Sequence, residues 1–371
     1  MLRKTLSGLP IARRAFSSRA ACRQGEHGVN NHSDPVGTTI ILPSLSIVEN
    51  SENAGLPGLF SDSVLKDIWT EQTAQKLDDL KYGISESPLR STLESAFVEY
   101  NSNKNVFLKG HKTSAANLME DFAITTNNPT IDKYYKLLSK TAKKPTEQFV
   151  FQNASAIYNL YYFLSSLKPN PDNTVAKVGV EELYKTPDVF SEIKNAPRPE
   201  FESQIEASFG SLQEFKTLLL STAKAVKGNG YTWLVYKFRQ PELGQETRDL
   251  SRFSSLAILN TYNHGTPHHF RAGQISNARA FKKQKSESSE EDDGSFSMYK
   301  IDIPSLEQAQ DTYDPLKYVY EPLMAIGNNP SFYLRDYGVF GKARYLENVW
   351  NCIDWSVVET RWANRALSTR R

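Results

Sequence analysis

The sequence predicts an α+β fold, with helices in its first half and strands in its second half. Long segments of the first half place apolar residues at helical spacing, which is typical of amphipathic helices. Three shorter segments of the second half are rich in β-branched, aromatic or leucine residues and indicate strands. Because the helices precede the strands, this order favours the α+β class.

Length and composition exclude several classes of protein. A chain of 371 residues with 39% hydrophobic residues can bury a core in one large domain or in two to three smaller ones. It contains no run of about 18 apolar residues, so we expect no membrane-spanning helix. Its two cysteines, Cys22 and Cys352, are too few for a disulfide framework or a Cys-rich zinc site. The net charge of +2 excludes a uniformly basic nucleic-acid-binding protein.

The N-terminus has the composition of a mitochondrial targeting segment. Residues 1–25 contain six Lys or Arg residues and no acidic residue. The motif Arg14-Ala15-Phe16-Ser17 resembles a mitochondrial processing site, so we predict residues 1–16 as a transit peptide and the matrix as the destination. The alternative is a basic arm without a targeting role. Cleavage after Phe16 would leave 40 Lys and Arg against 42 Asp and Glu, a net charge of −2.

Two segments follow the predicted transit peptide. Residues 17–56 are rich in small and polar residues and are predicted as an extended arm. Residues 57–170 are predicted as a helical domain. The apolar pattern of its first helix starts at Phe60, with Ser61 or Asp62 as the cap and Gly83 as the stop signal. The other helices are expected at 90–101, 130–140 and 147–168.

Residues 200–366 are predicted as a C-terminal α/β domain. Ser211 and Glu214 form a capping box at the start of a helix over 211–227, and Gly228 suits the left-handed position at its end. The expected strands are Tyr231–Lys237, Ser254–Thr261 and Tyr318–Ile326, and two closing helices are expected at 342–350 and 355–366.

A charged insertion, 267–312, interrupts the C-terminal domain. Within it, a basic cluster precedes a run of acidic residues and serines, which is typical of a disordered surface segment. The basic cluster is a candidate RNA contact and consists of Arg279, Lys282, Lys283 and Lys285. Lys104–Lys112 and Arg361–Arg371 are similar basic patches, and for each patch the alternative is a solvated charged surface.

Three collinear segments resemble the manganese/iron superoxide dismutases. They run through Phe151-Gln152-Asn153-Ala154 to Pro169, through Gly228-Asn229-Gly230-Tyr231-Thr232-Trp233, and through Pro322-Leu323-Met324-Ala325-Ile326 to Arg361. The resemblance implies an N-terminal long α-hairpin followed by a small three-stranded antiparallel sheet with flanking helices. It also implies the position of a site where that family binds one Mn or Fe through three His and one Asp.

At each of the four ligand positions that the resemblance assigns, this chain has a residue that cannot serve as the family's ligand. Ile68 and Leu160 replace the two helical histidines, and Gly327 and Ser331 replace the Asp and the last His. The approximate second-shell positions hold Gln72 and Lys76. We therefore expect no metal, no other cofactor, no catalytic residue and no enzyme activity. An aliphatic pocket should be dry and either filled or collapsed, because a cation there would be desolvated without a partner.

The six histidines and Cys352 offer few alternatives. His264, His268 and His269 follow the second predicted strand and could bind zinc, but they lack a fourth ligand, so surface histidines in a loop are the simpler interpretation. Cys352 lies between Trp350 and Trp355 and is expected to be a small buried side chain rather than a reactive thiol.

The resemblance extends to two dismutase-like proteins of fungal mitochondrial small ribosomal subunits that lack the metal site. It implies a structural component of that subunit, paired with a dismutase-like paralogue as a heterodimer and contacting other ribosomal proteins and, locally, rRNA. Neither a membrane nor a small-molecule substrate is expected. Two alternatives remain: a mitochondrial superoxide dismutase with rearranged ligands, and a free-standing assembly factor of the matrix.

Overall fold

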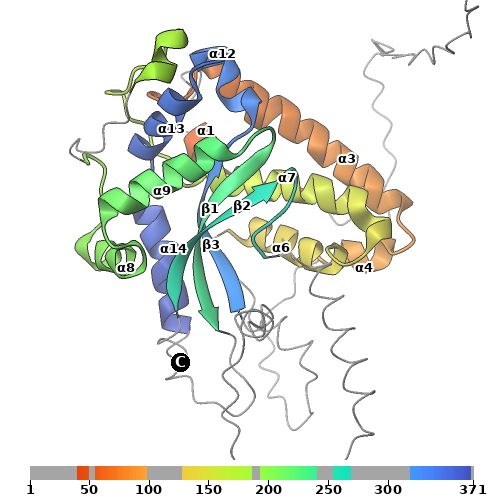
Figure 1. Ribbon diagram of the computed structural model, residues 1–371. Coiled ribbons are helices and arrows are strands. Elements are labelled where there is room, and N and C mark those ends of the chain that lie inside the picture. Colours follow the sequence, from red (N-terminus) through yellow and green to blue (C-terminus); the bar gives the residue numbers. More distant parts are fainter. Residues whose placement is uncertain are drawn as a thin grey trace, which may run out of the picture. The chain divides into compact units, whose positions relative to one another are not determined.

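The computed structural model describes residues 40–49, 55–97, 128–185, 193–239, 254–268 and 318–368. These residues belong to a compact unit, Thr38–Arg371, in which helices flank a three-stranded sheet (Figure 1). The predicted transit peptide 1–16, most of the predicted arm 17–56 and almost all of the insertion 267–312 lie outside the described residues. The α+β class and the three-stranded antiparallel sheet are confirmed.

The sheet consists of β1 (Gly230–Arg239), β2 (Ser255–Tyr262) and β3 (Tyr318–Gly327). Its order is β2-β1-β3 and both pairings are antiparallel, with β1 in the centre. The three strands agree with the predicted segments to within two residues. A register shift between Leu234 and Val235 lets Pro322 face Val235, which suits a residue that has no N–H for the ladder.

The first long helix starts where predicted, with Ser61 at its N-cap position, and differs from its prediction at its end. It starts as α2 (Asp62–Leu65), passes through a π-helical turn (Lys66–Glu71) and continues as α3 (Gln72–Glu86). The predicted stop at Gly83 is wrong, because the helix runs on to Glu86. A Cβ at Gly83 would lie 2.8 Å from Cδ1 of Phe149, so this glycine allows close helix packing instead.

The start of α2 shows why its capping signal was ambiguous. Ser61 occupies the N-cap position but makes no side-chain cap hydrogen bond. Instead, its backbone N–H and its hydroxyl both donate to the carboxylate of Asp336, at 2.8 and 2.7 Å. Ser61, which the sequence predicts as a helix cap, therefore connects α2 to the C-terminal part of the chain.

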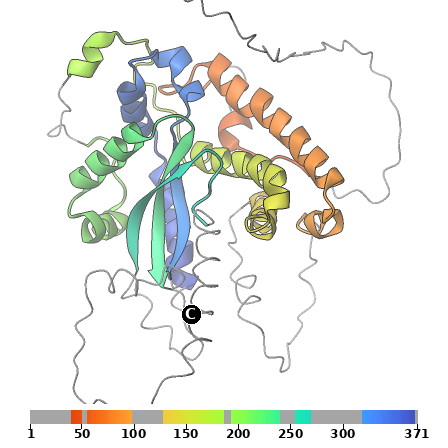
Figure 2. The same ribbon diagram turned by 45° about the vertical axis from the view of Figure 1, so that its right-hand side comes forward.

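The second long helix, α7 (Gln148–Leu164), packs against α3 and α6 (Figure 2). It follows η2 (Pro145–Glu147) and ends before Pro169, as predicted. The short helices are α4 (Arg90–Glu94), which is shorter than the predicted 90–101, and α6 (Pro129–Thr141). In the predicted arm, α1 (Ser46–Glu49) forms one turn, and the carbonyl of Ile41 accepts a hydrogen bond from Tyr134 of α6.

The helices of the C-terminal part include one that the sequence reading missed. α8 (Pro199–Phe209) has the usual signals, with Pro199 in its first turn and Gly210 after its end at a φ of +94°. The predicted capping box is confirmed, because Ser211 Oγ accepts from the backbone N–H of Glu214 at 3.1 Å. The remaining helices are η3 (Val180–Tyr184), α9 (Leu212–Ala225), η6 (Pro330–Phe332), α12 (Leu334–Tyr337), α13 (Lys342–Asn351) and α14 (Trp355–Ser368).

Gly228 does not end α9. The helix stops at Ala225 with Val226 as its C-cap, and Gly228 adopts its left-handed φ of +80° in the turn that leads into β1. The prediction of a left-handed glycine is therefore right, but its assignment to the helix end is wrong.

The core contains two tryptophans with no exposed surface, Trp233 of β1 and Trp350 of α13. Trp233 Nε1 donates to Thr261 Oγ1 at 2.8 Å, and the ring of Trp350 packs against Phe215 and Trp355. In the described ranges, no helix combines the length and the apolar character needed to cross a membrane.

We predict that Trp233→Ala and Trp350→Ala each lower the free energy of unfolding by about 3–5 kcal/mol, because each leaves a large cavity in the core. Urea denaturation followed by circular dichroism measures the change. Tyr184→Ala is the control, because this side chain is 82% exposed and its loss should cost less than about 0.5 kcal/mol. Equal costs for all three variants would contradict the assignment of the core.

Candidate functional site

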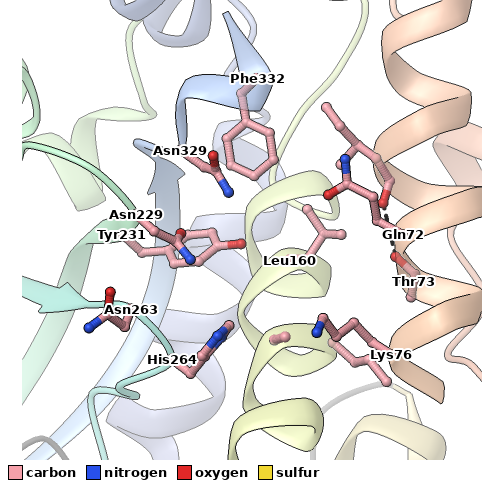
Figure 3. Close-up of a pocket in the computed structure, with 13 residues that line it drawn as sticks. Gln72, Thr73, Lys76, Leu160, Asn229, Tyr231, Asn263, His264, Asn329 and Phe332 are labelled. Atoms are coloured by element: carbon pink, nitrogen blue, oxygen red, sulfur yellow. Dashed lines mark hydrogen bonds between the residues drawn. The ribbon is translucent and has the colours of Figure 1, made fainter. Parts of the chain in front are cut away.

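The candidate site is a cavity of about 140 Å³ between the helices α3 and α7 and the ends of the three strands (Figure 3). It lies where the dismutase resemblance places a metal centre. Each surrounding element contributes to its walls, and the lining consists of Ile68, Gln72, Thr73, Lys76, Ala156, Ile157, Leu160, Asn229, Tyr231, Asn263, His264, Asn329 and Phe332.

Two of the predicted ligand replacements line this cavity directly. Ile68 comes from the π-helical turn and is 1% exposed, and Leu160 comes from α7 and is 8% exposed. Thr73 closes the turn below Ile68, since its hydroxyl donates to the Ile68 carbonyl at 3.0 Å. The helical side of the cavity therefore presents aliphatic carbon at both of these positions.

Gly327 ends β3 and leaves room for an aromatic ring. A Cβ built on Gly327 would lie 2.2 Å from Cε2 and 2.6 Å from Cδ2 of Phe332, and 3.0 Å from Cδ1 of Phe163. Phe332 is 3% exposed and packs against the rings of Phe163 and Tyr231. The space beside the Gly327 backbone that a larger side chain would occupy is thus already filled by the Phe332 ring.

Ser331 lies in the short helix η6 after β3. Its Oγ is buried and has no hydrogen-bond partner among the described residues. The preceding turn is held by Asn329, whose Oδ1 accepts from the backbone N–H of Ser331 at 3.0 Å. The side-chain amide nitrogen of Asn329 points towards the cavity (Figure 3).

The cavity is not collapsed and is not purely aliphatic, which corrects the expectation from the sequence of a filled or collapsed aliphatic pocket. Phe332 fills one end, but polar groups from several elements line the rest, among them Gln72, Lys76, Tyr231 and His264. Their positions near one another depend on tertiary packing, because they come from α3, from β1 and from the loop after β2. No spacing in the sequence connects them.

His264 is a cavity-lining residue that the sequence did not predict. The sequence favours a surface histidine in a loop, but the structure places it half-buried at the cavity wall. Ser155 of α7 fixes this loop by donating to the backbone carbonyl of His264. Burial lowers the pKa of His264, and the nearby Lys76 lowers it further. The useful signal was its position directly after β2, at the edge of the sheet that meets α7.

The histidines do not form a zinc site in the described part of the chain. His268 Nε2 lies 3.0 Å from the hydroxyl of Tyr158, and His269 lies outside the described residues. Among the described residues, no group of three or more His, Cys, Asp or Glu side chains could hold a metal ion.

The residues around the cavity do not fit a manganese or iron ion. Such a site needs imidazole and carboxylate ligands. Of the residues that line the cavity, only His264 offers an imidazole and none offers a carboxylate, while Lys76 places a positive charge beside the cavity. A divalent cation there would be desolvated and repelled.

Cys352 and Arg361 have structural surroundings. Burial raises the pKa of the Cys352 thiol to about 11, so the group stays protonated and packs as expected. Arg361 donates to Ser166 Oγ and to the Leu323 carbonyl, at 2.8 and 2.7 Å, and stacks over Tyr162. The guanidinium of Arg361 therefore makes contacts within the protein rather than with a partner. The other predicted RNA contacts, Arg279, Lys282, Lys283, Lys285 and the patch 104–112, lie outside the described residues.

Part of the chain is similar to a known family. Residues 197–274 match the family model for the C-terminal domain of iron/manganese superoxide dismutases. This segment is superoxide dismutase-like. The match runs from the segment before α8 through β1 and β2 to the loop that carries His264.

Three relatives illustrate the range of the dismutase-like proteins. The chain is 21% identical over 230 residues to small ribosomal subunit protein mS43 of Schizosaccharomyces pombe, covering 62% of this chain and 66% of that protein. It is 24% identical over 227 residues to mS42 of the same organism, covering 61% and 72%. It is 27% identical over 121 residues to a superoxide dismutase [Fe] of Campylobacter coli, covering 32% and 48%.

These similarities confirm the resemblance inferred from the sequence, both to the dismutases and to fungal small-subunit ribosomal proteins. The alignment with mS43 spans slightly less than two thirds of that relative, and the alignment with the iron enzyme spans about half of it.

We predict that Gly327→Asp, which restores the carboxylate of the dismutase family, lowers the free energy of unfolding by about 3 kcal/mol. The carboxylate would collide with the Phe332 ring and lose its hydration. Thermal and urea denaturation measure the cost. In a double-mutant cycle, Phe332→Ala should relieve part of this cost. The double variant should therefore lose less free energy of unfolding than the two single variants lose in sum.

Ser331→Ala is the matched control on the same loop. Its hydroxyl has no partner in the described structure, so its removal should change the free energy of unfolding by less than about 0.5 kcal/mol. If Gly327→Asp proved as harmless as Ser331→Ala, Phe332 could not occupy the space beside Gly327 as described.

Proposed function

We propose that the chain is a structural component of the mitochondrial small ribosomal subunit and acts in mitochondrial translation without catalysis. One observation carries the proposal: the dismutase framework is retained, while the cavity at its metal-centre position offers no fitting ligand set. Relatives named as small ribosomal subunit proteins mS43 and mS42 support the same role. A fold that lacks a catalytic ligand set can still provide surfaces for assembly, because function depends on the site and not on the fold.

The two long helices α3 and α7 correspond, in this proposal, to the helical hairpin of the dismutases. Their packing along one another supports this correspondence, as does the position of the cavity between them and the sheet. The domain boundaries follow, with 57–170 as the helical part and 200–366 as the part that contains the sheet.

The partners are other small-subunit ribosomal proteins, including a dismutase-like paralogue with which the chain forms a heterodimer. Similarity to both mS42 and mS43, two proteins of one organism, supports such a pair. The dismutases pair through the region that corresponds to the Gly327–Tyr333 loop of this chain. Two side chains next to this loop are exposed, Leu334 at 43% and Phe340 at 39%.

Contacts with rRNA are local in this proposal. After removal of residues 1–16 the chain carries a net charge of −2, which favours a position among proteins over extensive phosphate neutralisation. The cluster Arg279, Lys282, Lys283 and Lys285 is the proposed RNA contact, since a few clustered cations suffice for a local phosphate contact.

We predict that the tagged chain co-sediments with the mitochondrial small subunit in a sucrose gradient at high salt. High salt weakens loose electrostatic association but leaves an integral subunit protein in place. Mass spectrometry of the tagged fraction should recover the paralogue in equal amount. Sedimentation at the top of the gradient would contradict the ribosomal role and favour a free-standing matrix assembly factor.

An active dismutase with rearranged ligands is the second candidate, since the chain is 27% identical to an iron superoxide dismutase over 121 residues. We predict that the purified chain holds far less than one Mn or Fe per molecule and has no dismutase activity, because its cavity lacks carboxylates. Elemental analysis and an activity assay measure both. Stoichiometric metal with activity would refute the structural role.

A further inference from the structure

The cavity contains polar groups that have no partner in the described part of the protein. Tyr231 is 6% exposed, its hydroxyl points into the cavity (Figure 3), and it makes no hydrogen bond there to a described residue. The ring of His264 and the side-chain amide of Asn229 likewise have no described hydrogen-bond partner. His264 and Asn229 are only half-buried, so solvent can reach them, whereas the hydroxyl of the buried Tyr231 needs water or a ligand in the cavity as its partner.

The charge of the cavity is positive. Lys76 directs its ammonium group towards His264 (Figure 3), and no Asp or Glu lines the cavity among the described residues. The nearest acidic partner of Lys76 is Asp79, at a long distance of 3.9 Å between Nζ and Oδ2. Because this ion pair is long and its side chains are 39% and 38% exposed, the Lys76 ammonium keeps hydrogen-bonding capacity for an anion in the cavity.

The donors also match one chemical class of ligand. The ammonium of Lys76, the hydroxyl of Tyr231 and the amide of Asn229 can each donate to an oxygen atom. A purely apolar cavity of about 150 Å³ stays dry, whereas a polar one of similar size holds several waters or one small polar ligand. A cavity of about 140 Å³ with converging donors therefore suits a compact oxyanion.

We propose that this cavity binds a small oxyanion, a phosphate or a carboxylate, with Lys76, Tyr231 and Asn229 as the main contacts. A position that holds a cation in the dismutase family would thus hold an anion here. The site opens towards solvent along Gln72 and Lys76, which are exposed and half-exposed, so the ligand can enter without unfolding.

The test uses the full chain with inorganic phosphate as one probe and acetate as the other. Isothermal titration calorimetry at constant ionic strength, held with chloride, gives the affinity. A rise of the melting temperature with ligand concentration checks that the ligand binds the folded state. Saturable binding of either probe supports the oxyanion site, and the stronger probe identifies its source as free phosphate or as a carboxylate.

Three variants test the contacts. Lys76→Met should weaken binding about tenfold, as expected for a lost charge-assisted hydrogen bond. Tyr231→Phe keeps the ring against Trp233 and Phe332 and should weaken binding about fivefold. Lys81→Met is the control: it removes the same charge from an exposed position on α3 outside the cavity and should leave binding unchanged.

Circular dichroism and the melting temperature without ligand show whether each variant folds. The absence of saturable binding by the wild-type chain with both probes would overturn the proposal. Equal affinities for the Lys76→Met and Lys81→Met variants would overturn it as well, because binding would then depend only on net charge. The measurement needs no ribosome, so its result is independent of the sedimentation experiment.

Discussion

The packing of α7 between the first helices and the sheet is the constraint on which the rest of the structure depends. Most of its side chains are buried, so its polar residues must find partners in other segments. Ser155 and Asn159 donate to the carbonyls of His264 and Gly265, which fixes the loop after β2. Through these contacts, one helix sets the position of Leu160, of the cavity and of the residues opposite.

Apolar contacts connect the helices and the strands at this site. In a metalloprotein, the ion connects helices and strands through its ligands. Here apolar contacts make the connection, because Phe332 lies beside Gly327 and packs against Phe163 of α7. The hydrophobic contact itself needs no ion and no deprotonated ligand.

The cavity has an apolar wall and a polar wall. Ile68 and Leu160 present aliphatic carbon on the helical side. Opposite them, Tyr231 and His264 present polar atoms, and the buried Tyr231 hydroxyl is costly there unless it has water or a ligand.

Much of the fold follows from the sequence, because strands and capping motifs are local patterns. The strands agree with prediction to within two residues, and the capping box at Ser211 lies where expected. What the sequence could not show depends on distant neighbours. Gly83 resembles a helix stop until Phe149 is placed beside it, and the capping serine before α2 bonds Asp336 instead.

The same limit applies to the site. The resemblance located Ile68 and Leu160, and the structure places both on one cavity, but the polar wall around His264 was missed. Its residues come from elements that are far apart in the chain, and no periodicity relates them. Only the packing of α7 against the sheet brings them together.

The contacts of α14 affect the order in which the protein can fold. Residues near the end of α7 pair with the chain almost 190 residues later: the N–H of Lys168 bonds Cys352 at 2.7 Å, and that of Asp354 bonds Ser166 at 2.8 Å. Arg361 then secures α14 on α7 and β3. Because synthesis starts at the N-terminus, the apolar surface of α7 is made long before these partners. We therefore expect the core to close only once the last helix is present.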